Sequence, residues 1–136
     1  MDFIRETLST LPNFIAYIVV GGGLQALFFL IYLWITPYRE LMLIREGNTA
    51  AAISLSGAMI GFTLPLASVI SHAASLVDTA LWAIVALAVQ VGAYVIARFV
   101  IPEFGRAIPE GKIAPAVLKA AFAISFGMLN AACLTY

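Results

Sequence analysis

Four long apolar stretches follow one another along the chain, separated by short polar connections. The uncharged run at residues 13–35 is followed by apolar segments at about residues 49–71, 79–101 and 114–134. Each segment has the roughly 20 residues that a membrane-spanning helix needs. The pattern predicts an all-α integral membrane protein with four transmembrane helices. Residues 1–136 then form a single membrane domain, and the short connections leave no room for a soluble one.

The second predicted span carries small and polar residues where a lipid-facing helix carries large apolar ones. Gly57 and Gly61 form a GxxxG motif, which lets two helix backbones approach closely. We expect the face that contains this motif to pack against a helix, to contact another subunit or to line a pore, whereas the opposite face, with Phe62, Leu66 and Val69, suits lipid. The small-residue face recurs at steps of three or four residues, the spacing of one side of a helix: Ser54, Gly57, Gly61, Pro65, Ser68 and His72.

Composition agrees with a membrane protein and narrows its partners. Hydrophobic residues make up 63% of the chain and charged residues 10%, against about 25% charged residues in an average soluble domain. The formal net charge is zero, so we expect the lipid bilayer as a partner and no nucleic acid. Cys133 is the one cysteine in the sequence, which excludes an internal disulfide and a cysteine-based zinc site. No metal and no cofactor are predicted.

The distribution of basic residues predicts the orientation in the membrane. Residues 1–11 alternate apolar and charged positions, which predicts a short amphipathic segment at the membrane surface that ends at Pro12. Arg98 and Lys119 fall inside predicted spans, near the ends that adjoin the charged connections, and we expect both side chains to extend toward the aqueous interface. The positive-inside rule puts the connections after the first and third spans in the cytoplasm. Both termini are then periplasmic or extracellular.

The two halves of the chain resemble each other. A shift of 65 residues aligns Gln25 with Gln90, and a shift of 64 aligns the Glu-Gly pair at residues 46–47 with the pair at residues 110–111. This similarity predicts two tandem helical hairpins, at about residues 13–71 and 79–135. Because each hairpin has an even number of spans, both keep the same orientation, as in parallel transporter repeats.

Polar residues inside the predicted spans are the candidate functional positions. Gln25 and Gln90 fall at similar depths, where they either line a polar pathway, together with Asn130, or only hold helices together. His72 and Asp78 flank the outer connection and form either a pH-sensitive gate or ordinary helix ends. The absence of an acidic residue deep in a span argues against a pump coupled to protons or cations.

Several segments of the sequence resemble a known family. The stretches GNTAA, GFTLPL and NAACLTY, with ITPYRELMLIREG before them, resemble the YjfL family of small bacterial inner-membrane proteins, which consist of a tandem domain of unknown function. The resemblance implies a four-span protein of the bacterial inner (plasma) membrane. It implies no activity and no catalytic residue.

Two functional hypotheses remain after this reading. The chain has no HExxH motif, nucleotide-binding loop or Ser/His/Asp set, so we do not expect an enzyme. The first hypothesis is a non-enzymatic membrane protein that assembles with itself or with another membrane protein through the small-residue face of the second span. The alternative is a small oligomeric channel or transporter for ions or small polar solutes, lined by Gln25 and Gln90.

Overall fold

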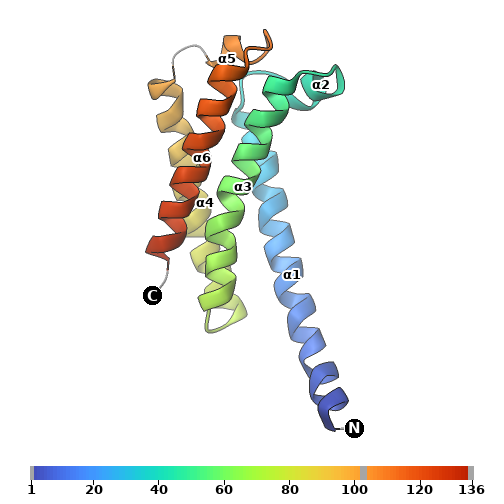
Figure 1. The fold of residues 1–136 in the computed structure, drawn as a ribbon. Helices are drawn as coiled ribbons and strands as arrows, with labels where there is room; N and C mark the ends of the chain where they lie inside the picture. The colour runs from blue at the N-terminus through green and yellow to red at the C-terminus, as the bar shows by residue number, and fades with distance from the viewer. Residues whose placement is uncertain (1, 102–103, 135–136) are drawn as a thin grey trace.

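The computed structural model describes residues 2–101 and 104–134, which form a bundle of long helices (Figure 1). These helices have the length and apolar composition to cross a membrane, so the four-span, all-α prediction is confirmed. The two short helices α2 and α5 lie at one end of the bundle, and both chain ends point toward the other (Figure 1). In chain order the helices are α1 (Asp2–Ile35), α2 (Glu40–Arg45), α3 (Thr49–His72), α4 (Leu76–Val100), α5 (Phe104–Ala107) and α6 (Ile113–Cys133).

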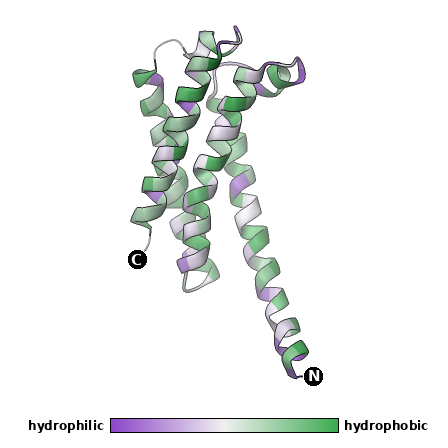
Figure 2. Ribbon diagram, in the orientation of Figure 1, coloured by the Kyte–Doolittle hydropathy of each residue, from purple (hydrophilic) through white to green (hydrophobic). Residues whose placement is uncertain are grey.

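The surface of the bundle suits hydrocarbon rather than water. Hydrophobic residues dominate the four long helices, and hydrophilic residues gather mainly at their ends and in the connections (Figure 2). Large apolar side chains such as Leu30, Phe99 and Leu118 are exposed on the outside. In a soluble protein such a surface would be an aggregation hazard, whereas in a bilayer it faces lipid.

Helix α1 is longer than the sequence predicted. It continues through Pro12 without interruption, so the predicted break and the separate surface segment before it are wrong. Proline removes a single amide from the helix, and spanning helices tolerate that loss where other groups satisfy the backbone. The hydroxyl groups of Thr7 and Thr10 donate to carbonyl oxygens of the preceding turn. At 1.5 Å per residue the 34 residues of α1 extend about 51 Å, beyond the rest of the bundle (Figure 1).

The small-residue face of α3 packs against α6 of the same chain. A Cβ atom added to Gly61 would lie 2.6 Å from the carbonyl oxygen of Ala123, and one added to Gly57 would meet the backbone of Ala120. Gly127 of α6 comes equally close to the backbone of Gly61. The two helices approach this closely because glycine has no side chain to separate them.

The remaining residues of this face extend the same contact along α3. Ser54 and Pro65 are buried, and the Ser68 hydroxyl donates to the carbonyl oxygen of Ala131 at 3.0 Å. His72 lies beyond the contact and is exposed at the end of the helix. Of the roles expected for this face, packing between helices of one chain is the one that the contacts support. The face is covered by α6 and is not available to a second subunit.

The opposite face of α3 is also buried, which corrects its predicted exposure to lipid. Phe62 and Val69 have no exposed surface. The ring of Phe62 stacks on Phe28 of α1, with 4.7 Å between the ring centres, and Gly21 of α1 brings its backbone close to Ile70. Helix α3 therefore lies between α6 and α1, and the pattern of large apolar residues alone does not distinguish such a central helix from one that faces lipid.

The two turns before α3 and α6 have the same backbone structure. Gly47 and Gly111 both adopt a positive φ, +87° and +81°, which glycine accepts without strain. The amide of Gly47 donates to the carbonyl of Ile44, and the amide of Gly111 donates to that of Ile108, with each atom shifted by 64 residues. We propose on this match that residues 13–71 and 79–135 are copies of one hairpin.

The contact between α3 and α6 yields a test by substitution. Gly61→Leu should lower the free energy of unfolding by about 1–3 kcal/mol, because the larger side chain forces the two backbones apart. Gly92→Leu is the matched control, since a Cβ atom at Gly92 meets nothing within 4 Å. Unfolding in detergent micelles measures both variants. Equal stability of the two variants, with a smaller oligomer for Gly61→Leu, would instead make the face a contact between subunits.

Candidate functional site

A lysine lies buried among polar groups near the α2–α5 end of the bundle. The side chain of Lys119, on α6, is 3% exposed, so the prediction that it extends to the aqueous interface is wrong. Its ammonium group donates hydrogen bonds to the Ser54 hydroxyl at 2.7 Å, to the Tyr38 hydroxyl at 3.3 Å and to the Tyr32 hydroxyl. The three N–H groups of the ammonium group thus have three hydroxyl acceptors inside the bundle. At the interface, water would have to supply these acceptors.

Aromatic rings surround the same ammonium group. The nitrogen of Lys119 lies 4.7 Å from the ring centre of Tyr32 and 5.1 Å from that of Tyr94. These distances are within the range of a cation–π interaction, which is strongest where water is excluded. The two tyrosine rings themselves meet edge to face at 5.4 Å. The site therefore combines hydrogen-bond acceptors with ring faces that favour a positive charge.

A buried glutamate, Glu40, completes a cluster that we define by these residues: Tyr32, Tyr38, Glu40, Ser54, Tyr94 and Lys119. Glu40 is the first residue of α2, in a stretch expected to be a polar connection, yet the residue is only 1% exposed. The Tyr32 hydroxyl donates to its carboxylate Oε1 at 3.4 Å. Within the described part of the chain, the second carboxylate oxygen, Oε2, has no hydrogen-bond partner. Lys119 and Glu40 are thus linked through one tyrosine hydroxyl.

Burial sets the protonation of the groups at the margin of the cluster. It raises the pKa of Glu40, and the charge of Lys119 and hydrogen bonds from Ser54 and Tyr32 offset that rise only in part. Burial, and then the charge of Glu40, also raise the pKa of Tyr38. Glu40 therefore holds a proton at a higher pH than an exposed glutamate does.

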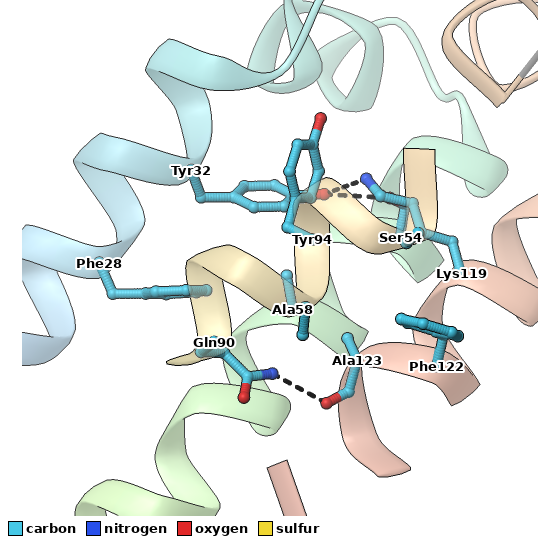
Figure 3. Close-up of a pocket in the computed structure, with 11 residues that line it drawn as sticks. Phe28, Tyr32, Ser54, Ala58, Gln90, Tyr94, Lys119, Phe122 and Ala123 are labelled. Atoms are coloured by element: carbon cyan, nitrogen blue, oxygen red, sulfur yellow. Dashed lines mark hydrogen bonds between the residues drawn. The ribbon is translucent and has the colours of Figure 1, made fainter. Parts of the chain in front are cut away.

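A small cavity adjoins the cluster on the side away from α2. Its volume is about 20 Å³, which is enough for one water molecule. Tyr32, Ser54, Gln90 and Lys119 line it together with aromatic rings and alanines (Figure 3). The side-chain nitrogen of Gln90 donates to the Ala123 carbonyl at 2.9 Å. The side-chain oxygen of Gln90 is buried without a partner among the described residues, so a water in the cavity would satisfy it.

A second, open pocket lies at the α2–α5 end. Its volume is about 430 Å³, and Thr36, Tyr38 and Glu40 are among the residues that line it. Because Glu40 lines this pocket and Tyr32 lines the inner cavity, the hydrogen bond between their side chains connects the two spaces. The cluster is therefore the element that separates the open pocket from the interior.

The structure does not bring Gln25 and Gln90 together. Gln25 donates to the Met59 carbonyl and accepts from the Thr63 hydroxyl, each at 3.3 Å, and so joins α1 to α3. Gln90 joins α4 to α6 and alone reaches the cavity. Asn130 is buried and donates to the Ala86 carbonyl at 3.1 Å. Of the two roles expected for the glutamines, holding helices together is the one that these contacts support, because each glutamine bonds the backbone of the next spanning helix along the chain.

The predicted outer gate consists of two local helix-end contacts. His72 lies 2.8 Å from the carbonyl oxygen of Ser68 in its own helix. Asp78 accepts from the amide of Ala74 at 3.1 Å, just before α4. No cluster of His, Cys, Asp and Glu residues with metal-binding geometry occurs within residues 2–101 and 104–134.

Of the residues that form the cluster, only Ser54 was a predicted contact position. Lys119 was expected at the aqueous interface, and Glu40 was expected in a polar connection. A usable signal was present, because three tyrosines, at positions 32, 38 and 94, fall near the same end of the bundle as Lys119. Tyrosine supplies both a ring and a hydroxyl, the two features that a buried ammonium group needs.

Comparison with known proteins places this sequence among uncharacterised membrane proteins. Residues 6–134 match the family described as Domain of Unknown Function (DUF350). The UPF0719 inner membrane protein YjfL of Escherichia coli strain K12 is 33% identical over 129 residues, which cover 95% of this chain and 98% of that protein. The protein of the same name from Escherichia coli O157:H7 matches equally well. No solved structure matches the chain.

Proposed function

Since this chain belongs to the DUF350 family and is a multi-pass inner-membrane protein, we propose that it is a small, non-enzymatic channel or transporter for ions or small polar solutes. One observation carries the proposal: Lys119 and Glu40 are both buried between the helices, beside a cavity. Ionisable residues inside a membrane domain are expensive, and they typically mark ion or substrate pathways.

Stability alone does not account for these two residues. Moving a charged group from water into the protein interior costs roughly several kcal/mol of free energy. The attraction between two buried opposite charges often does no more than offset that cost. Apolar residues of similar size would hold the same helices together without this cost. The arrangement suits a site at which charge or a polar group has to be bound and released.

The pathway that we propose differs from the one expected from the sequence. It leads from the open pocket past Glu40 and Tyr32 to Lys119, and then through the cavity to Gln90. Asn130 donates to the carbonyl of Ala86, one turn before Gln90 in α4, and we propose that the pathway continues past it toward the end of the bundle where α1 begins and α6 ends. Gln25 is not part of this pathway.

Assembly is the second candidate, and α1 is the surface that favours it. The first half of α1 extends past the other helices with its apolar side chains exposed (Figure 1). Cβ atoms at Gly22 and Gly23 would meet nothing within 4 Å, so this backbone is open to close approach by another helix. We propose α1, rather than the covered face of α3, as the contact with a second copy or with another membrane protein.

We further propose that α2 and α5 face the cytoplasm and that both termini are periplasmic or extracellular. Arg39, Arg45, Arg106 and Lys112 lie at the α2–α5 end, and Arg5 is the one arginine or lysine near the opposite end. The exposed thiol of Cys133 should therefore react with a membrane-impermeant maleimide in intact cells whose outer membrane has been permeabilised. Reaction only after the inner membrane is also opened would reverse the orientation.

Reconstitution in liposomes tests the transport function. Vesicles that contain the protein should pass at least one of K⁺, Cl⁻ or H⁺ faster than empty vesicles do. Glu40→Gln and Lys119→Met should each lower that flux by about tenfold or more, the effect of raising a barrier by about 1.4 kcal/mol. Gln25→Leu, Glu46→Gln and Lys112→Met are controls outside the pathway and should leave the flux unchanged. Absence of flux for all tested ions would favour the assembly role.

A further inference from the structure

We propose that the species transferred at this site is the proton, and that Lys119, Tyr32 and Glu40 carry it in sequence. The inference rests on the proposed function, because it takes the cluster as part of a transport pathway. It deepens that function by naming what the pathway transports. The geometry points to it in three ways: the size of the cavity, the signs of the two charges, and the order of the hydrogen bonds.

The cavity is too small for a hydrated ion or an organic solute. Its volume of about 20 Å³ holds one water molecule, whereas a cation such as Ca²⁺ needs about six to eight oxygen ligands. Besides the two charged residues, the site offers hydroxyl groups and one amide oxygen. A water and a proton fit this space without a change in the positions of the helices.

The two charges exclude most other ions. Ser54 and Tyr32 hold the ammonium group of Lys119 in the site, and its positive charge repels a metal cation there. The carboxylate of Glu40 repels an anion at the entrance from the open pocket. A proton is the one ion that both groups bind, because an amine and a carboxylate each accept it directly.

Hydrogen bonds lead from the lysine to the glutamate through the Tyr32 hydroxyl, which also shares a hydrogen bond with the Ser54 hydroxyl at 3.2 Å. Lys119 donates to the Tyr32 oxygen, and the Tyr32 hydroxyl donates to Glu40 Oε1 at 3.4 Å. In the transfer, an N–H bond of Lys119 breaks as an O–H bond forms on Tyr32, and the original O–H bond of Tyr32 breaks as one forms on Glu40. The net result is the transfer of one proton: the tyrosine is regenerated, the ammonium group becomes a neutral amine, and the carboxylate becomes a neutral carboxylic acid.

Each end of this relay adjoins a space that can hold water. Glu40 lines the open pocket, where water can take its proton. Lys119 lines the inner cavity, where a water that donates one hydrogen to the oxygen of Gln90 can pass its other hydrogen to the amine. A proton that enters from the opposite side of the membrane then replaces the one that this water gave up. The uncovered oxygen of Gln90 therefore has a role as the anchor of that water.

Groups from three further segments surround the relay. Tyr38 comes from the connection before α2, Tyr94 and Arg98 come from α4, and the hydroxyl of Ser54 comes from α3. Arg98 is exposed, so solvent screens its charge. Burial raises the pKa of Glu40, so its carboxyl group accepts the proton at a higher pH than an exposed glutamate does.

Proton flux into liposomes with an internal pH dye tests the inference. A K⁺ gradient with valinomycin sets the membrane potential, and K⁺ and Cl⁻ fluxes are recorded in separate vesicles without valinomycin. Wild-type protein should pass protons but neither K⁺ nor Cl⁻. Tyr32→Phe keeps the ring and removes the hydroxyl. It should lower the proton flux by about tenfold or more, since the loss of a positioned proton-transfer group usually lowers a rate by about 100-fold or more. Tyr17→Phe, in the same helix, is the matched control.

The outcomes separate this inference from the proposed function. Flux of K⁺ or Cl⁻ that falls in Glu40→Gln, without proton flux, would keep the transport function and overturn the proton. Proton flux that is unchanged in both Tyr32→Phe and Glu40→Gln would overturn the relay. No flux of any of the three ions would overturn both proposals.

A spectroscopic measurement covers the case in which a variant does not fold. Infrared spectra of the wild-type protein in lipid should show the carbonyl stretch of a protonated carboxyl group at a pH above the usual range of glutamate. The band should persist in Glu46→Gln, an exposed glutamate, and it should shift in frequency in Glu40→Asp. A spectrum without such a band at any pH above that range would overturn the assignment of Glu40 as a proton carrier.

Discussion

The ammonium group of Lys119 has to find partners inside the bundle, and this requirement shapes the α2–α5 end of the structure. Ser54 of α3, Tyr32 of α1 and Tyr38 of the following connection supply those partners. Glu40 then balances the charge from α2, through Tyr32. Three spanning helices and one short helix are thus held in place by one positive charge, because none of them can move away without leaving it unsatisfied.

Close packing between α3 and α6 makes this arrangement possible. The glycines of the two helices remove the side chains that would otherwise separate them, so the stem of Lys119 reaches Ser54 directly. The small residues, which the sequence suggested as a surface for partners, thus form a contact between two helices of the same chain. They bring a polar group of α3 within reach of a charged group of α6.

The sequence predicted the parts of this fold that depend on local patterns. The four spans follow from runs of apolar residues, and the two similar turns follow from the repeated Glu-Gly pairs before α3 and α6. Which face of a spanning helix meets protein depends on the arrangement of all the helices, and Phe62 shows the limit: its apolar ring suits lipid and core equally well.

The candidate site could not be predicted from such local patterns, because its contacts also depend on the arrangement of all the helices. Gln25 and Gln90 share a depth, but each bonds the backbone of the next spanning helix, a choice that no spacing within one helix reveals. Glu40 lies in a short connection, and only the fold turns it inward under Tyr32. A charged side chain near a helix end either extends to water or finds a buried partner. The partner comes from segments that are distant in the sequence.

The central claim is that Lys119 and Glu40 depend on each other inside the bundle, and a double-mutant cycle measures that dependence directly. The free energy of unfolding in micelles is compared for the wild type, Lys119→Met, Glu40→Gln and the double variant. The account predicts that each single substitution costs about 3–5 kcal/mol, because it leaves the other charge buried and uncompensated. The double variant should cost less than the sum by about 1–3 kcal/mol. Costs that add to within about 0.5 kcal/mol would contradict the account.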